Sequence, residues 1–292
     1  MKNYVKYILA LVIFGSNGVF ASMIAMSSGE LVFMRTVIGG AFLLLVMVIG
    51  RQWTQREILK REFWRLILSG ICLGVNWILL FEAYKQMSVS LATLAYYCAP
   101  VIVLAVSPVV LGEKLDRRAF VGIAVVVVGM ILATGIGGHA TPIGMACGLG
   151  SALFYAGLIL VNKKIEGVGG LNLTFFELVI AAIVLLPYVL ISHGGVHLPS
   201  DTKGILALLF LCIVNTGVAC WLYFSSMNQL PARTVALCGY IDPISALLFS
   251  AVFLNEHLTV IQLIGAVFVL AGAILGQPKQ SRETSDSVRS AL

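Results

Sequence analysis

Long apolar stretches alternate with short polar segments along the whole chain. Each stretch holds about 20 residues, enough for one helix to cross the roughly 30 Å hydrocarbon core of a bilayer. Ten such stretches each predict a membrane-spanning helix, and they lie at 4–26, 31–50, 64–85, 88–111, 119–136, 142–161, 173–192, 204–226, 233–253 and 259–276. The segments between them are too short for a soluble domain. The pattern therefore predicts an all-α integral membrane protein with ten transmembrane helices.

Composition agrees with this pattern. Hydrophobic residues make up 60% of the chain and charged residues 11%, whereas soluble domains carry about 25% charged residues. The first stretch is too long for a signal peptide and has no small-residue cleavage site, so we expect it to be the first span. Residues 277–292 are polar, and we expect them to form a disordered tail.

The distribution of positive charge predicts the orientation of the chain. With the N-terminus in the cytoplasm, sixteen of the 19 Lys and Arg residues fall in segments on that side, only Lys85 and Lys203 on the other, and Arg35 inside a helix. This asymmetry is typical of a multi-pass protein with both termini in the cytoplasm, here in the plasma (inner) membrane. A nucleic-acid partner would need a clustered basic face with aromatic residues, which the sequence lacks.

The chain also repeats itself. A shift of 143 residues aligns 74–132 with 217–275, and 19 of the 59 positions are identical without a gap. The matches include Tyr97/Tyr240, Pro100/Pro243, Glu113/Glu256, Gly122/Gly265 and Gly129/Gly272. Apolar composition alone would not align Tyr, Pro and Glu in register.

The repeat predicts two halves of five helices each, 1–137 and 138–276, followed by the tail. Because five is odd, the second half enters the membrane from the opposite side. Two inverted halves are an architecture of secondary transporters, in which the site lies near the bilayer midplane and opens alternately to either face.

In each half, a proline is followed after twelve residues by Glu-x-Leu and then by a helix with glycines seven apart. This glycine spacing predicts one smooth face on each of these two helices. With ten predicted helices, the chain resembles the EamA-type transporters of the drug/metabolite transporter superfamily, as far as about Gly276. Such families often carry Trp-Gly in the first helix, where this chain has Phe14-Gly15. The resemblance implies a cavity lined by the first four helices of each half and substrates such as exported amino acids or other small organic metabolites.

Asp242 is the leading candidate for a site residue. It falls near the middle of an apolar helix, where a charge costs about 2.5–3.5 kcal/mol on insertion scales. Its counterpart in the first half is Ala99, so the fold itself does not need the acid. We expect Asp242 to bind an ammonium group or take up a proton, the alternative being an acid paired only for packing. The adjacent Pro243, and Pro100 in the other half, predict helix bends.

Arg35 has two interpretations. Near the outer end of its helix, its side chain can reach the interface, or it can be a fixed cation that meets a substrate carboxylate or pairs with Glu82. Glu82 is a further candidate for proton coupling, although Lys85 three residues later is an alternative partner. Glu177 lies one turn inside its helix, near Lys163 and Lys164, and has a weaker claim to the substrate path.

Further candidates are polar and aromatic residues in the middle of predicted helices, since mid-helix Asn is better placed facing protein than lipid. The candidate cavity residues are Asn17, Asn76, Trp77, Tyr97 and Tyr240. Glu113 and Glu256 recur in both halves, so we expect structural roles for them in capping or in binding loop amides.

The sequence offers no enzyme chemistry. Its six cysteines lie within predicted helices without metal-ligand spacing, and its four histidines lie in outer loops. No Ser-His-Asp set, metal cluster or phosphate-binding loop appears, so we expect no cofactor and no bound metal. The hypothesis is a secondary exporter of amino acids or related metabolites, a candidate for proton coupling; the alternatives are an uptake permease, a cationic-drug pump or a membrane sensor or enzyme without flux. We expect the close-packing glycines to act within a monomer rather than in a homodimer.

Overall fold

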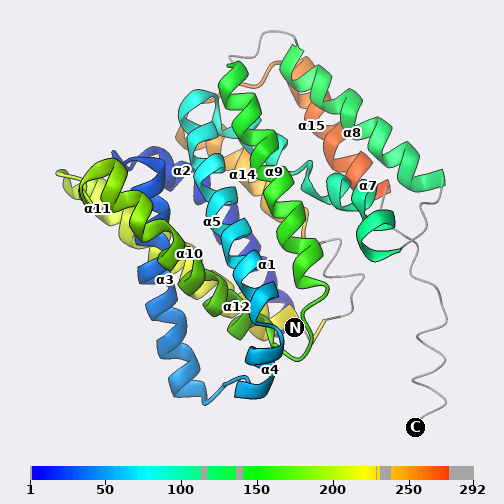
Figure 1. Cartoon of the computed structure of the whole chain (residues 1–292). Helices are drawn as coiled ribbons and strands as arrows, with labels where there is room; N and C mark the ends of the chain where they lie inside the picture. The colour runs from blue at the N-terminus through cyan, green and yellow to red at the C-terminus, as the bar shows by residue number, and fades with distance from the viewer. Residues whose placement is uncertain (1, 113–116, 136–140, 228, 231–237, 276–292) are drawn as a thin grey trace.

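The computed structural model describes residues 2–112, 117–135, 141–227, 229–230 and 238–275. Every regular element in this part of the chain is a helix (Figure 1). The first half contains α1 Lys2–Gly15, α2 Asn17–Ser22, α3 Ser28–Gly50, α4 Arg56–Arg61, α5 Phe63–Gln86, α6 Val89–Tyr96, α7 Ala99–Leu111 and α8 Arg117–Gly135. The second contains α9 Pro142–Asn162, α10 Gly170–His193, α11 Thr202–Leu209, η1 Phe210–Val218, α12 Ala219–Met227, α14 Ile241–Phe253 and α15 Val260–Leu275.

Seven helical segments in the described residues are long and apolar enough to cross a membrane. They are Lys2–Ser22, Ser28–Gly50, Phe63–Gln86, Val89–Val110, Pro142–Asn162, Gly170–Ser192 and Thr202–Met227. Two shorter apolar helices, α14 and α15, follow, and α8 covers the fifth predicted stretch. The ninth predicted stretch begins at residue 233, outside the described residues, so the count of ten stays a prediction.

The outer surface suits lipid rather than water. Large apolar side chains on several helices are highly exposed, with Val109 at 88% and Ile191 at 84%. Monomeric soluble proteins rarely present such continuous apolar surface. The helices satisfy their own backbone hydrogen bonds, as the hydrocarbon region requires.

Three of the long segments are interrupted part-way. The first breaks at Ser16 between α1 and α2, and another breaks between α6 and α7 at Tyr97 and Cys98. Pro100 lies in the first turn of α7 and Pro243 in the first turn of α14. In a first turn the missing proline N–H leaves no helical hydrogen bond unmade, so each proline follows a break instead of bending a continuous helix. The third interruption is η1, a π-helical segment between α11 and α12.

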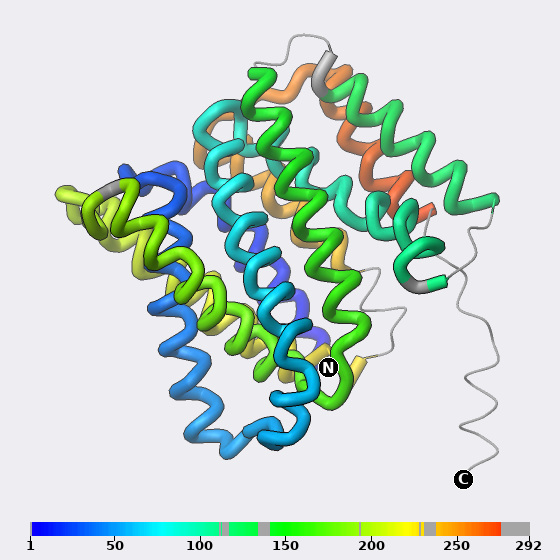
Figure 2. The backbone as a smooth tube through the Cα atoms, viewed as in Figure 1, coloured from blue at the N-terminus to red at the C-terminus, as the bar shows by residue number. Residues whose placement is uncertain are grey.

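Helix packing interleaves the two halves (Figure 2). From the second half, α9 packs on α5, and α10 packs on both α3 and α5. From the first half, α1 packs on α12 and α14, and α3 packs on η1. A separate pair, α8 and α15, lies to one side of this bundle.

The glycines seven residues apart make the α8–α15 contact possible. A Cβ atom on Gly265 would lie 2.6 Å from both Ala133 N and Gly129 O, and one on Gly272 would lie 2.8 Å from Gly122 O. These are backbone atoms that cannot move aside. The smooth faces expected from the sequence therefore contact each other within one chain.

Glu256 of the second half forms hydrogen bonds to the first half at one end of the bundle. Its carboxylate accepts hydrogen bonds from Val89 N at 2.7 Å and from the backbone N and hydroxyl of Ser90 at 3.0 and 2.7 Å. It thus satisfies N–H groups at the beginning of α6, which is the structural role expected from the sequence. Its counterpart Glu113 and the tail at 277–292 lie outside the described residues.

Candidate functional site

Arg35 lies buried in the centre of the bundle, with 5% of its surface exposed. Its Nε donates to Thr216 Oγ1 at 2.7 Å, Nη1 to Asn17 Oδ1 at 2.7 Å, and Nη2 to Asn215 Oδ1 at 3.0 Å. The guanidinium carbon stands 4.0 Å from the ring centroid of Trp77, a cation–π contact. The side chain therefore points inward from α3 and does not reach the interface.

The partners of this buried cation are all neutral. A guanidinium carries five N–H groups, and three of them bond to the oxygens of Asn17, Asn215 and Thr216. Among the described residues no carboxylate pairs with it. A buried charge without a counter-ion is costly, so the site is complementary to an anionic group of a ligand.

The π-helical segment η1 presents two of these partners. Asn215 and Thr216 are adjacent in sequence, and both bond the same guanidinium. The Thr216 hydroxyl also donates to Leu211 O, five residues earlier, at 2.9 Å. Asn215 Nδ2 donates to Ile13 O at 2.6 Å, which orients its Oδ1 toward Arg35. π-Helical turns inside α-helices occur frequently at functional sites.

Asp242 forms a second charged position, in the first turn of α14. Its side chain is half-buried and faces the ring of Tyr97, at the break between α6 and α7. The positive end of the helix dipole favours a carboxylate at this position. Gly15 lets α1 approach closely here, since a Cβ atom on it would lie 2.9 Å from Asp242 O.

Two tyrosines lie near both charged positions. Tyr84 and Tyr96 lie within electrostatic reach of both Arg35 and Asp242. Tyr96 also stacks on Tyr155, with ring centroids 4.8 Å apart. Beside Tyr96 lies the buried Asn76, whose Oδ1 accepts from Ser151 at 2.7 Å, while its Nδ2 makes no hydrogen bond within the described part of the chain. The arrangement offers a cation, an acid, a buried amide group and aromatic walls.

Known proteins share this sequence pattern and fold. The model of the EamA-like transporter family matches residues 2–135 and again residues 142–276. The chain belongs to the EamA-like transporter family.

Relatives of this EamA-like transporter include proteins of two bacteria that are named as a transporter and as an efflux pump. The "Uncharacterized transporter YxxF" of Bacillus subtilis is 28% identical over 93% of this chain and 88% of its own. The "Probable amino-acid metabolite efflux pump" of Salmonella typhimurium is 30% identical over 66% of this chain and 69% of its own. A crystal structure with 19% identity superimposes with a TM-score of 0.67, covering 94% of this chain and 97% of the other, which shows a shared fold.

The structure of this EamA-like transporter groups most of the candidate residues from the sequence. Asn17 and Trp77 contact Arg35, Tyr97 faces Asp242, and Asn76 lies beside Tyr96. Tyr240 is half-buried and directly precedes α14.

Glu82 lies apart from this group. It accepts hydrogen bonds from Ser28 at 2.9 Å and from Gln86 at 3.2 Å. The neighbouring Lys85 donates to Met26 O at 2.8 Å. The sequence alternative in which Arg35 pairs with Glu82 is therefore wrong, because both side chains bond elsewhere.

Five residues at the site were not among the candidates from the sequence: Tyr84, Tyr96, Tyr155, Asn215 and Thr216. Thr216 faces Arg35 because η1 changes the helical register, and no sequence pattern signals that change. Tyr84 follows two residues after Glu82 and carries no motif.

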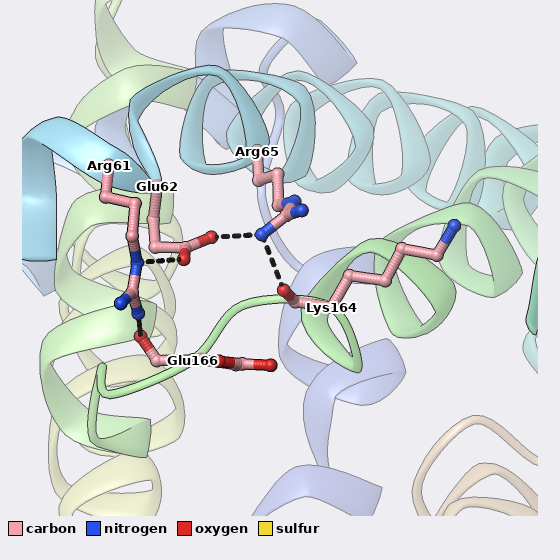
Figure 3. Close-up of polar contacts among 5 residues, drawn as sticks. All are labelled: Arg61, Glu62, Arg65, Lys164 and Glu166. Atoms are coloured by element: carbon pink, nitrogen blue, oxygen red, sulfur yellow. Dashed lines mark hydrogen bonds and ion pairs between the residues drawn. The ribbon is translucent and has the colours of Figure 1, made fainter.

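At one end of the EamA-like bundle, a polar cluster links the segment before α5 to the segment after α9 (Figure 3). Glu62 is buried before α5 and binds Arg61 Nε at 2.9 Å and Arg65 Nη1 at 2.7 Å. The same arginines donate to carbonyls after α9, Arg61 to Glu166 O at 3.2 Å and Arg65 to Lys164 O at 2.9 Å. The hydrogen bond from Arg65 holds the pKa of Glu62 below its ordinary value.

At the other end, a second polar contact links the start of α3 to the segment before α11. Glu30 begins α3 in a capping box with Ser27, and its Oε1 accepts from His197 N at 2.8 Å. The His197 ring nitrogen Nδ1 lies 2.9 Å from the same oxygen. Among the described residues no three His, Cys, Asp or Glu side chains are grouped as metal ligands.

Proposed function

We propose that this EamA-like transporter is a secondary transporter of small zwitterionic metabolites, with amino acids as the leading class. Arg35 binds the substrate carboxylate, Asp242 binds the ammonium group, and the tyrosine and tryptophan rings contact the side chain between them. The observation that carries this proposal is the buried guanidinium of Arg35, which has three neutral partners and two remaining N–H groups. Aromatic walls with a few convergent polar groups suit small organic ligands.

The architecture we propose is ten membrane-spanning helices arranged as two inverted halves, 1–137 and 138–276. Exchanging the halves maps several contacts between helices onto other contacts. The α5–α9 contact maps onto α12–α1, α10–α5 onto η1–α3, and α7–α9 onto α14–α1, and all six occur. The family model also matches each half separately. Such symmetry lets either end open around one central site.

We propose export as the direction, because a relative at 30% identity bears the name of an amino-acid metabolite efflux pump. The membrane is the plasma membrane, with both termini in the cytoplasm and the monomer as the working unit. Uptake of the same substrates, or efflux of cationic drugs, is the second candidate. A substrate with only a positive charge would bind to Asp242 and the tyrosines, and Arg35 would have no role in binding it.

Binding to purified protein tests this proposal. The ligands are apolar amino acids, their methyl esters, which lack the carboxylate, and their deaminated acids, which lack the ammonium group. In calorimetry, the native protein should bind the amino acid more tightly than it binds either the methyl ester or the deaminated acid. Arg35→Gln should reduce amino-acid binding and leave ester binding unchanged, whereas Asp242→Asn should reduce binding of the amino acid and of the ester.

Transport in proteoliposomes gives the second readout. Asp242→Asn should also reduce amino-acid flux, because the substrate ammonium group loses its anionic partner. If Arg35→Gln and Asp242→Asn both kept native affinity for the amino acid, a site that binds its carboxylate and its ammonium group would be contradicted. Ester transport that survives Arg35→Gln, with no amino-acid transport by the native protein, would favour the cationic-drug alternative.

A further inference from the structure

A second acid lies inside the bundle, on the Tyr155 side of the proposed substrate site. Glu177 projects from α10 toward α5 and α9 and has 5% of its surface exposed. Its Oε1 contacts the Ser69 hydroxyl and accepts from Asn162 Nδ2 at 2.7 Å. Ser69 Oγ also lies 2.6 Å from Asn162 Oδ1. The three side chains thus form a closed triangle of short polar contacts.

This triangle needs more hydrogens than an ionised acid provides. Asn162 Nδ2 supplies the hydrogen for its contact with Glu177. Ser69 has one hydroxyl hydrogen but faces two oxygens, Asn162 Oδ1 and Glu177 Oε1. If Glu177 were ionised, one of these oxygen pairs would have no hydrogen between them. A proton on Glu177 resolves this, because the acid then donates to Ser69 and Ser69 donates to Asn162.

The conclusion does not depend on how the Asn162 amide is oriented, which heavy-atom positions do not fix. With the amide turned over, Nδ2 donates to Ser69 and Ser69 donates to Glu177. The contact at 2.7 Å then joins Asn162 Oδ1 to Glu177 Oε1, two oxygens. Only a proton on the carboxyl group makes that contact a hydrogen bond.

The surroundings of Glu177 contain no compensating cation within the described residues. The titratable groups that face it are Cys72 of α5, Tyr155 of α9 and Cys220 of α12. Lys164, one of the two lysines that the sequence places near Glu177, offers its backbone carbonyl to Arg65. Burial without a cation favours the neutral form of an acid. Glu62, by contrast, binds two arginines.

We propose that Glu177 holds a proton in this conformation and releases it when the cluster of Figure 3 opens. Arg65 lies four residues before Ser69 on α5, and Lys164 lies two residues after Asn162, so the acid is one helical turn inside that cluster. Opening admits water, which takes the proton. The carboxylate then accepts from Ser69 and Asn162, each with its own hydrogen, and the contact between Ser69 and Asn162 Oδ1 is given up. Resting on the proposed transport function, this assigns the coupling proton to Glu177 and the substrate ammonium to Asp242.

Infrared spectroscopy of the purified full-length protein in lipid nanodiscs tests the proton directly. At neutral pH the native protein should show the C=O band of a protonated carboxylic acid, shifted in D₂O. Glu177→Gln should remove this band, whereas Glu62→Gln, which alters an ion-paired carboxylate, should leave it. Glu177→Asp keeps a carboxyl group and should keep a band, which separates loss of the acid from damage to the fold. A band unchanged by Glu177→Gln overturns the proposal.

Flux measurements separate this proposal from the proposed function. With an apolar amino acid as the probe, Glu177→Gln should bind it with native affinity but transport it at a rate independent of the pH gradient. Loss of amino-acid binding in Glu177→Gln, or gradient dependence retained in it, would contradict the coupling role. If the native protein binds no amino acid, the proposed substrate class fails, while the infrared result still decides whether Glu177 holds a proton.

Discussion

The Thr216 hydroxyl fixes the position of the buried Arg35 guanidinium. It accepts from Arg35 Nε and donates to Leu211 O, so both of its polar functions are used. A hydrogen bond to a charged group contributes about 1.5–3 kcal/mol. The residue thereby couples the π-helical segment η1 to the proposed carboxylate site.

Thr216→Val should weaken binding of a zwitterionic ligand about tenfold or more, at about 1.4 kcal/mol for each factor of ten. Valine keeps the branched shape but leaves Arg35 Nε without its acceptor. Calorimetry with the best amino-acid ligand measures the effect. Thr36→Val is the matched control, because Thr36 is also buried and its hydroxyl bonds only Phe33 O of its own helix. Equal losses in both variants would contradict a specific role for Thr216.

For single residues, the sequence predicted which side chains are candidates for the site, but it did not predict which of them contact one another. A charged or amide side chain in an apolar helix stands out in the sequence, which is how Arg35, Asp242, Asn17 and Asn76 were identified. Which of them touch depends on helix register. The change of register at η1, which brings Thr216 to Arg35, arises from tertiary packing and has no local sequence signature.

Among the helices, α8 and α15 pack closely against each other, and their glycines explain why. Their glycines allow backbone atoms to approach within distances that no side chain tolerates. The glycine spacing was visible in the sequence and predicted a smooth face on each helix. The partner of each face was not visible, since the same spacing serves a homodimer.

Gly265→Ala should destabilise the protein by about 1–3 kcal/mol, the usual cost of overpacking. Its new Cβ atom would meet backbone atoms of Ala133 and Gly129 at 2.6 Å. Thermal unfolding in detergent measures the loss. Gly157→Ala on α9 is the control, because its Cβ atom would meet only Cys72 Sγ, at 3.6 Å. A Gly265→Ala protein as stable as the control would show that this helix contact is loose.

In the whole molecule, the two ends of the bundle are held by different chemistry. The cluster around Glu62 joins the segments before α5 and after α9, and the Glu30–His197 contact joins the segments before α3 and before α11. Exchanging the halves maps one pair of segments onto the other. Under the proposed alternating access, opening either end would break one of these clusters while the other stays intact.

Glu62→Gln should loosen its end of the bundle at neutral pH, with faster hydrogen exchange in residues 163–169. The pKa of Glu62 is lowered on folding, so its stabilising effect is complete above the ordinary value of 4.5 and is lost as the pH falls through the lower folded value. Exchange rates corrected for intrinsic pH dependence should therefore converge between native and variant proteins in acid. Glu57→Gln, at an exposed position on α4, is the control. A constant difference at all pH values would exclude the ionised carboxylate as the cause.

Inversion of the two halves is the prediction on which alternating access depends. Lys114 and His257 occupy matching positions in the repeat, so an inverted arrangement places them on opposite sides of the membrane. With the six native cysteines replaced, a membrane-impermeant maleimide should label His257→Cys in intact cells, but Lys114→Cys only after permeabilisation. Lys203→Cys and Arg56→Cys serve as controls for the outer and inner sides. Labelling of Lys114→Cys and His257→Cys from the same side would mean that the repeats are parallel, and a parallel repeat cannot interchange the two ends by exchanging the conformations of its halves.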